Sequence, residues 1–214
     1  MKGDTIVVEE HHVRAAQGVA ELVRPLLENA TRLGVTIAGE SGSGKSETAQ
    51  ALADTLRAAG IPAVIFQQDD YFVYPPRSND RARREDITWV GPQEVHLDTL
   101  DAHLAAFLGG ADSVDKPLVD YAADAIGEET LAFGDARVAI AEGTYTTLLE
   151  NVGVRVFIDR TFEQTRAHRE KRRRDTAELD PFIEQVLAIE HDIIAAHKPR
   201  ASIVIDDAYT AHAQ

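Results

Sequence analysis

Short apolar runs along the chain alternate with longer segments in which apolar residues recur at helical spacing. The apolar runs are rich in Val and Ile and lie at residues 34–40, 61–70, 136–143, 154–160 and 201–206. Each run predicts a strand of a mainly parallel sheet, because such strands are covered on both faces and lack polar alternation. Helices are predicted between these strands, at residues 45–60, 92–108, 161–175 and 181–197. This alternation is typical of a layered α/β domain.

Three further segments complete the predicted organisation. Apolar residues at helical spacing in 19–27 predict an amphipathic helix within an N-terminal helix region, residues 1–33, with Pro25 at one end or at a kink. Two short extended pieces in residues 116–133 flank a polar turn and predict a small hairpin. The polar, arginine-rich stretch at residues 74–86 predicts no regular element, and the strand at 201–206 is expected to be the last.

Composition narrows the classes of protein to which this chain can belong. Its 214 residues are 44% hydrophobic, enough to bury the core of one domain, and no repeat or linker divides residues 1–214. The formal net charge of −14 disfavours a nucleic-acid or membrane partner, so any anionic ligand must be bound by local groups. The absence of cysteine excludes disulfides, thiolate metal sites and a cysteine nucleophile. With neither a signal core nor a spanning apolar stretch, we expect a cytoplasmic protein.

The strongest chemical signal is Gly39-Glu40-Ser41-Gly42-Ser43-Gly44-Lys45-Ser46, which matches the phosphate-loop pattern G-x-x-x-x-G-K-[ST] in full. It lies between a predicted strand and a predicted helix, so the loop amides and the helix N-terminus converge on phosphate oxygens. Lys45 is expected to reach the β- and γ-phosphates, and the Ser46 hydroxyl to bind Mg²⁺. The expected contacts of the nucleoside triphosphate are Gly39, Ser41, Gly42, Ser43, Gly44, Lys45, Ser46 and Glu47.

A loop of this kind occurs in switch GTPases, transport ATPases and small-molecule kinases. The chain contains neither an N-K-x-D stretch, which reads guanine, nor the L-S-G-G-Q stretch of transporter ATPases. Both absences disfavour the first two of these classes.

Three carboxylates follow predicted strands, at the edge where ligands bind in a doubly wound sheet. Asp69 and Asp70 end the second strand, where a carboxylate can accept the proton of an attacking hydroxyl and help to hold Mg²⁺ through water. Paired aspartates also cap turns and helices, and this alternative stays open. Glu142 follows a strand and precedes Gly143, a place suited to a magnesium contact or to a buried, turn-capping glutamate.

Positive charge is concentrated in one stretch, which contains Arg166, Arg169, Lys171, Arg172, Arg173 and Arg174. A nucleic-acid patch and a solvated helix face are two interpretations of such a run. We favour a third, a mobile lid over about residues 162–180 whose arginines neutralise the transferring phosphoryl group and exclude water. Charge alone does not identify which of these arginines contacts phosphate.

Six motifs follow one another along the chain in the order GESGSGKS, QQDDYF, TWVGP, PLVDY, VAIAEGTY and RRRD. In this order and spacing the chain resembles the uridine kinase-like family of P-loop kinases, which includes phosphoribulokinase, pantothenate kinase and nicotinamide riboside kinase. The resemblance covers roughly residues 35–206 and implies a three-layer P-loop NTPase domain with a mainly parallel central sheet and a small lid. It also implies Mg²⁺-dependent transfer of the γ-phosphate of ATP to a hydroxyl of a small metabolite.

The resemblance also implies roles for individual residues. Asp69 is the implied catalytic base, because it stands first in Asp69-Asp70-Tyr71-Phe72, where Asp70 fills a variable position. By position the implied catalytic residues are Asp69, Lys45 and Arg174, the metal ligands Ser46, Asp69 and Glu142, and the lid contacts to the nucleotide Arg169 and Arg173.

The acceptor side departs from the pyrimidine nucleoside kinases. Val90 occupies the position of an aspartate that holds ribose in those enzymes, while Val119 and Asp124 replace a tyrosine and a histidine near the base. These differences disfavour uridine and cytidine without disfavouring a kinase. Expected acceptor contacts, which as scattered aromatics can also be core residues, are Tyr71, Trp89 and Tyr121, together with Asp69 and Asp120.

We therefore expect a kinase whose acceptor is nucleoside-like or another small metabolite. The alternatives are a kinase of a non-nucleoside alcohol, an ATP-binding regulatory protein without transfer chemistry, and a nucleic-acid-directed protein that uses the basic run. No subunit interface can be named from the residues, and a homo-oligomer stays open. His11 and His12 are expected in a flexible, exposed segment near the start of the chain.

Overall fold

A six-stranded sheet forms the centre of the protein, with the strand order β2-β5-β1-β6-β7-β8. The computed structural model describes residues 1–3, 6–166 and 180–214. Neighbouring strands pair in parallel, except that β8 is antiparallel to β7 at one edge. The strands are β1 (Leu33–Gly39), β2 (Ala63–Gln67), β5 (Val138–Glu142), β6 (Val154–Ile158), β7 (Ile203–Ile205) and β8 (Ala211–Ala213). The predicted, mainly parallel sheet is confirmed.

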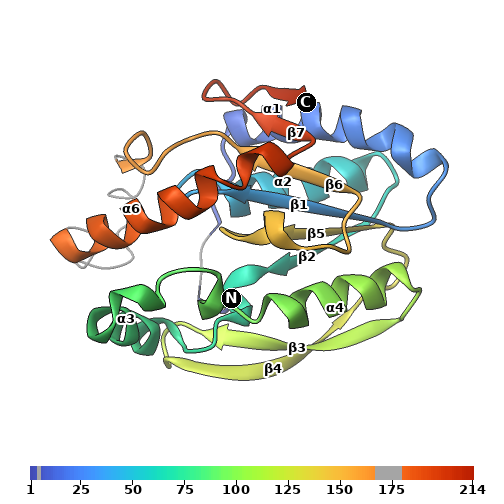
Figure 1. Cartoon of the computed structure of the whole chain (residues 1–214). Helices are drawn as coiled ribbons and strands as arrows, with labels where there is room; N and C mark the ends of the chain where they lie inside the picture. Colours follow the sequence, from blue (N-terminus) through green and yellow to red (C-terminus); the bar gives the residue numbers. More distant parts are fainter. Residues whose placement is uncertain (4–5, 167–179) are drawn as a thin grey trace.

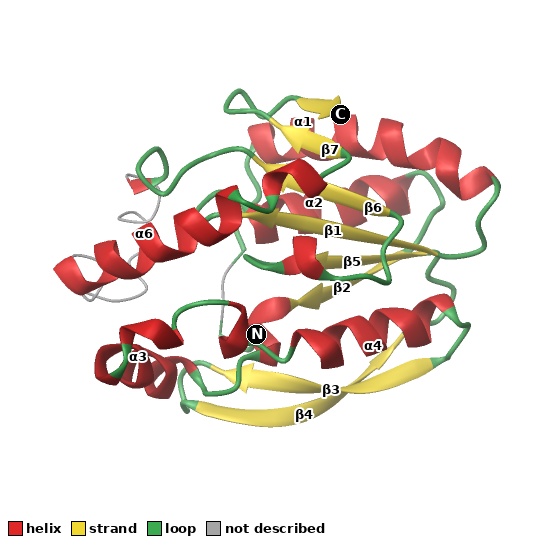
Figure 2. Cartoon of the chain, viewed as in Figure 1, coloured by secondary structure: helices red, strands yellow, loops and turns green. Residues whose placement is uncertain are grey.

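Helices cover both faces of this sheet and give the fold three layers (Figure 1, Figure 2). The apolar side chains of α1 (Glu10–Val23) and α2 (Lys45–Ala58) share one hydrophobic core with β1, β5 and β6. Those of α4 (Leu97–Leu108) and α6 (Pro181–Ala195) form a second core on the opposite face. The predicted three-layer α/β architecture is thus confirmed. None of the helices in the described ranges is long and apolar enough to cross a membrane.

Short 3-10 turns join these elements and set where several of them end. One turn begins directly after α1 and contains Pro25 in its first positions, as the position of that proline predicts. The turns lie at Arg24–Glu28, Gln68–Tyr71, Ile87–Trp89, Pro92–Glu94, Thr146–Leu148 and Lys198–Arg200.

A two-stranded hairpin of β3 (Ser113–Asp120) and β4 (Ala125–Ala132) lies apart from the central sheet, beside α4 (Figure 1). Its antiparallel pairing confirms the predicted hairpin. Leu131 of β4 packs into the core that contains Phe107 of α4, so the hairpin is attached through α4. The backbone N–H of Lys2 donates to the Val119 carbonyl at 2.9 Å, so the start of the chain runs along β3.

A further helix, α3 (Pro76–Glu85), forms where the sequence pattern predicts no regular element. The amide of Arg77, in its first turn, donates to Asp124 Oδ1 at 2.7 Å. Near its end, Arg84 pairs with Asp80 at 2.8 Å and with Asp180 at 2.8 Å. Asp124 and Asp180 are distant in sequence from this helix. Because polar contacts of this kind stabilise α3, the pattern of apolar residues along the chain does not predict it.

Two expectations for the ends of the chain are wrong. His11 and His12 lie in α1, and the His12 side chain is fully buried against the phosphate loop rather than exposed. The strand at residues 201–206 is not the last, because β8 adds an antiparallel edge. Tyr209 lies between β7 and β8 and contacts both histidine rings, with centroids 4.2 and 5.5 Å away. These tertiary contacts order both ends.

The ends of β2 and β5 are packed tightly against each other through Gly143. This glycine has a φ of 154°, and a Cβ built on it would lie 2.3 Å from Gln68 Cβ. Gln68 Oε1 accepts the Tyr145 amide at 2.7 Å, so the two strand ends are also joined by a buried hydrogen bond. Only glycine fits this junction without displacing Gln68.

We expect Gly143→Ala to lower the free energy of unfolding by about 2 kcal/mol, because the added methyl group overlaps the Gln68 side chain. Denaturant unfolding measures this loss. The matched control is Gly127→Ala on β4, where the nearest atom to an added Cβ is 3.9 Å away and a change within about 0.5 kcal/mol is expected. Equal losses in the two variants would contradict this account of the junction.

Candidate functional site

The phosphate-loop motif forms the connection between β1 and α2 that its sequence predicts. Gly42 and Gly44 have φ of 74° and 91°, in the left-handed region that glycine adopts without strain. A Cβ on Gly44 would lie 2.8 Å from His12 Nε2, so this residue must also be small. Because α2 begins at Lys45, its N-terminal amides face the loop and favour an anion there.

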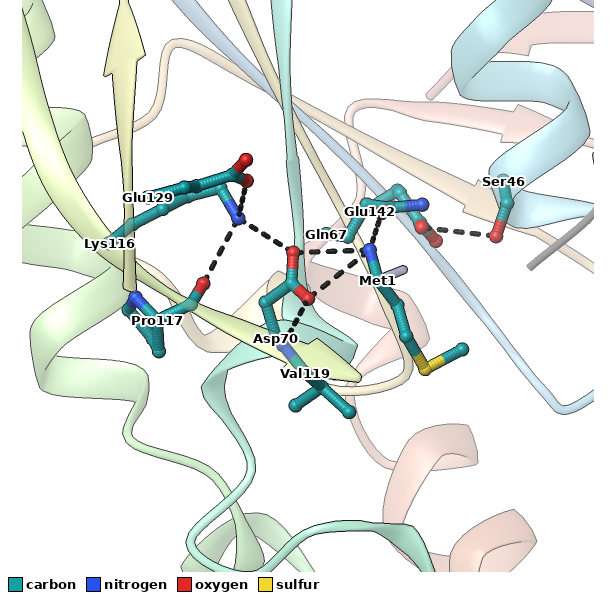
Figure 3. Close-up of polar contacts among 9 residues, drawn as sticks. All are labelled: Met1, Ser46, Gln67, Asp70, Lys116, Pro117, Val119, Glu129 and Glu142. Carbon is teal, nitrogen blue, oxygen red and sulfur yellow. Dashed lines mark hydrogen bonds and ion pairs between the residues drawn. The ribbon is translucent and has the colours of Figure 1, made fainter. Parts of the chain in front are cut away.

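The lysine of the motif is held across the loop. Lys45 Nζ donates to the Glu40 carbonyl at 2.9 Å. Ser46 Oγ donates to Glu142 Oε1 at 3.0 Å, which links the first turn of α2 to the end of β5 (Figure 3). The predicted phosphate residues and two predicted metal ligands, Ser46 and Glu142, therefore lie together at one edge of the sheet.

The Glu40 side chain joins the loop to the start of the segment proposed as a lid. Glu40 accepts a hydrogen bond from the Phe162 amide at 2.6 Å and contacts His191 Nδ1 of α6 at 2.8 Å. Thr165 Oγ1 donates to the Ser41 carbonyl at 2.9 Å. The predicted lid arginines Arg169, Arg173 and Arg174 lie outside the described residues. Their roles stay predictions.

The register of the strands places the carboxylate of Glu142 beside the phosphate loop. Glu142 pairs with Ile37 of β1 and with Gln67 of β2, so the ends of these three strands stand at one level. Glu142 is 5% exposed, and burial, together with the charge of nearby Asp69, raises its pKa to about 7. A cavity of about 220 Å³ beside the loop is lined by residues that include Ser46, Asp70 and Glu142.

The oxygen atoms of Ser46, Asp69 and Glu142 fit Mg²⁺, which prefers oxygen ligands. The described residues contain no cluster of three or more acidic or histidine side chains that could form a metal cage. Mg²⁺ is usually bound by one or two carboxylates together with phosphate groups. A buried carboxylate with a raised pKa is also a group that a cation would stabilise in its charged form.

The two adjacent aspartates point to different surroundings. Asp70 is 1% exposed and accepts hydrogen bonds from Lys116 Nζ at 2.7 Å and the Val119 amide at 3.1 Å (Figure 3). The terminal nitrogen of Met1 lies 3.2 Å from the same carboxylate. Asp70 thus anchors the hairpin to the end of β2. Half-buried Asp69 instead lines a second, open cavity.

This cavity has a volume of about 180 Å³. It is lined by Met1, Asp69, Phe72, Pro76, Asn79, Arg83 and Tyr121. Asn79 and Arg83 are four residues apart on α3 and therefore lie on the same face of that helix. They were missed in the sequence because the helical register of residues 76–85 was not recognised.

The predicted acceptor contacts lie in different places. Tyr121 lines the cavity, as expected. Trp89 donates from Nε1 to Asn79 Oδ1 at 2.9 Å, so it orients a residue that lines the cavity. Asp120 instead accepts the Ala123 amide at 2.9 Å in the hairpin turn, and this hydrogen bond lowers its pKa.

Tyr71 is also placed differently from the expectation. Its side chain is fully buried, and its hydroxyl lies 2.9 Å from His103 Nδ1 of α4. Burial, together with the negative charge of Asp70, raises the pKa of this hydroxyl. Tyr71 therefore packs α4 against the end of β2, and the neighbouring Phe72 lines the cavity instead.

Comparison with known proteins identifies relatives of the whole domain. A family model described as Phosphoribulokinase / Uridine kinase family matches residues 35–206. The bifunctional alpha-galactosidase/sucrose kinase AgaSK of Mediterraneibacter gnavus is 27% identical over 186 residues, which are 81% of this chain and 20% of that protein. This chain thus spans only about a fifth of that relative.

A curated protein and a solved structure are similar to this chain over most of their own length. Uridine kinase of Leuconostoc citreum (strain KM20) is 24% identical over 185 residues, which are 81% of this chain and 86% of that protein. A solved structure of D-glycerate 3-kinase from Cryptococcus neoformans var. grubii is 13% identical, with a TM-score of 0.64 over 93% of this chain and 99% of that one. The last likeness concerns the fold alone.

The raised pKa of Glu142 predicts a dependence of stability on pH. An ordinary glutamate has a pKa of about 4.5, so between this value and about 7 the folded state binds more protons than the unfolded state. The free energy of unfolding contributed by Glu142 therefore falls as pH rises through this window. Because Glu142→Gln cannot ionise, its stability relative to the unmodified protein should rise by about 2 kcal/mol between pH 5 and pH 8.

Denaturant unfolding without Mg²⁺ or nucleotide measures this difference. Glu128→Gln, at an exposed position on β4, is the matched control and should change by less than about 0.5 kcal/mol over the same range. A stability difference for Glu142→Gln that does not vary with pH would contradict the assigned pKa.

The buried pair of Asp70 and Lys116 predicts strong coupling. Lys116→Met should lower the free energy of unfolding by about 3 kcal/mol, because it removes the nearer of the two cations that compensate the buried Asp70 carboxylate. Adding Asp70→Asn should then cost less than Asp70→Asn alone, since the charge that lacks a partner is gone. Losses that simply add in the double variant, measured by denaturant unfolding, would show that the two groups act independently.

Proposed function

Because the chain belongs to the phosphoribulokinase/uridine kinase family, we propose that it transfers the γ-phosphoryl group of ATP, bound with Mg²⁺, to a hydroxyl group of a small metabolite. The observation that carries this proposal is the position of Asp69. Its charge acts on Glu142 beside the phosphate loop, and its side chain lines the cavity that contains Asn79 and Tyr121. This position supports a role for Asp69 between the bound phosphates and an acceptor.

The nucleotide would be held by the loop amides between Gly39 and Gly44 and by Lys45. Lys45 now donates to a backbone carbonyl of the same loop, and it can exchange that carbonyl for a phosphate oxygen, which binds an ammonium group more strongly. Mg²⁺, held by Ser46 with Asp69 and Glu142, would supply charge neutralisation at the phosphates.

Asp69 would act as the general base of the transfer. Its carboxylate takes the proton of the acceptor hydroxyl while the hydroxyl oxygen bonds to the γ-phosphorus and the bond to ADP breaks, so the products are ADP and a phosphorylated alcohol. Asp70, held by Lys116 and the Val119 amide, fixes the turn that carries Asp69. Arg174, with Arg169 and Arg173, is proposed to close over the phosphates.

The acceptor is proposed to be nucleoside-like or another small alcohol. The named relatives phosphorylate a disaccharide, a nucleoside and a hydroxy acid by their names, so they span several chemical classes. Val90 is buried and offers no polar group. Asp124, which replaces a histidine near the base in the uridine kinases, accepts hydrogen bonds from Arg77 and Ser78 of α3. These placements favour a non-nucleoside alcohol.

The proposed function predicts ADP release from Mg-ATP that depends on an acceptor, measured with a panel of nucleosides, sugars, hydroxy acids and vitamin precursors. We expect Asp69→Asn to lower kcat at least about 100-fold, because the proton acceptor is lost, while ATP affinity stays nearly unchanged, because the loop amides and Lys45 that hold the phosphates remain. Lys45→Ala should abolish turnover and weaken ATP binding.

Asp135→Asn is the matched control, since Asp135 is exposed and precedes β5 at the opposite end of the sheet. It should retain full turnover. If Asp69→Asn turns over as fast as the unmodified protein, the proposed base is wrong. If ATP binds but no acceptor stimulates ADP release, a regulatory ATP-binding protein is the better description.

A further inference from the structure

The cavity of about 180 Å³ that Asp69 lines, here called the acceptor cavity, contains the guanidinium group of Arg83, whose charge is already compensated by carboxylates. Among the described residues that line the cavity, Arg83 is the only one with a cationic side chain. Its Nε and Nη2 donate to the two carboxylate oxygens of Glu94 at 2.5 and 2.6 Å. Nη2 also donates to Glu190 Oε1 of α6 at 3.0 Å. Two carboxylates therefore face one guanidinium.

Burial makes this arrangement difficult to exchange for a ligand. Glu94 is fully buried, and Glu190 is 8% exposed. A phosphate or carboxylate that took the fork of Arg83 would leave one of these side chains buried and ionised without its partner, which is strongly unfavourable. The other cation at the cavity wall, the terminal nitrogen of Met1, is paired with Asp70.

The net charge around the cavity is negative. The terminal nitrogen of Met1 is balanced by Asp70, and the three carboxylates of Asp69, Glu94 and Glu190 outnumber the single remaining positive charge, that of Arg83. Burial raises the pKa of Glu190, and even with this group protonated two carboxylates remain against one cation. An anionic acceptor would thus meet like charge beside the hydroxyl that reacts.

The remaining polar groups suit hydroxyl groups, which both donate and accept hydrogen bonds. Asn79 Oδ1 is occupied by the Trp89 indole, so its amide N–H groups are the ones available as donors in the cavity. Tyr121 adds a hydroxyl and Asp69 an acceptor, while Phe72 gives an apolar wall. The volume of about 180 Å³ is below the roughly 300–1,000 Å³ typical of sites for drug-sized ligands.

From this geometry we infer that the acceptor is a small uncharged polyol, such as a sugar, a sugar alcohol or the sugar part of a neutral nucleoside, and that Arg83 with Glu94 and Glu190 excludes phosphorylated sugars and hydroxy acids. This inference rests on the proposed kinase function. The carboxylates are the determinants of specificity, because they neutralise a cation that would otherwise bind an anion.

The test compares matched neutral and anionic acceptors with Mg-ATP, using a protein of residues 1–214 that is tagged after residue 214, because Met1 lines the cavity. The pairs are glucose and glucose 6-phosphate, fructose and fructose 6-phosphate, ribose and ribose 5-phosphate, glycerol and glycerate, and uridine and uridine monophosphate. We expect kcat/KM of the best neutral acceptor to exceed that of its anionic partner at least about 100-fold. Asp69-dependent turnover that favours an anionic member would overturn the inference and leave the kinase standing. ADP release that no acceptor stimulates would instead contradict both.

A second measurement addresses the determinants directly. Glu190→Gln keeps the size of the side chain and removes one of the two compensating charges, so the ratio of anionic to neutral kcat/KM should rise about tenfold. Asp192→Asn, at an exposed position on the same helix, is the control and should leave this ratio unchanged. An unchanged ratio in Glu190→Gln would show that charge compensation of Arg83 does not set the preference. The acceptor pairs test the neutral class on the unmodified protein even if this variant does not fold.

Discussion

The parallel register of three strands is the constraint on which the candidate site depends. Ile37 of β1 and Gln67 of β2 both pair with Glu142 of β5. Because the strands run in the same direction, their carboxyl ends meet at one edge, where the phosphate loop, Asp69 and Glu142 follow. A slip of one residue in either pair would turn the side chain of Glu142 to the other face of the sheet. Gly143 and Gln68 hold the same junction by close packing.

A buried ion pair gives two adjacent aspartates separate roles. Lys116 of the hairpin reaches Asp70 across 46 positions of sequence, and the Val119 amide completes the contact. The hairpin is outside the central sheet, yet this contact and α4 join it to the end of β2. Because Asp70 is held on that side, the 3-10 turn presents Asp69 to the cavity and to Glu142. A structural pair thus orients the proposed base.

An acidic chain can bind a polyphosphate because the positive groups are local and the loop uses backbone dipoles. The net charge of −14 gives no general attraction for anions. In the loop, the amides and the start of α2 provide a site for phosphate, with Lys45 at its centre. Buried Lys116 and half-buried Arg83 are also cations near the site, but carboxylates hold both of them. The phosphate loop therefore suits an anionic ligand, whereas the acceptor cavity suits an uncharged one.

The sequence by itself determined the parallel strands of the central sheet, the hairpin, the phosphate loop and the placement of Glu142 at a strand end. Each of these depends on residues that are contiguous in the chain, so spacing and glycine positions are enough to predict them. Only the tertiary structure decided which aspartate faces the cavity, that α3 supplies Asn79 and Arg83, that Tyr71 is a core residue, and that His12 packs against Gly44. These outcomes depend on partners such as Lys116, Glu190, His103 and Gly44, which are distant in sequence. Burial and charge pairing between distant residues leave no periodic signal in the sequence, so these placements follow only from the three-dimensional fold.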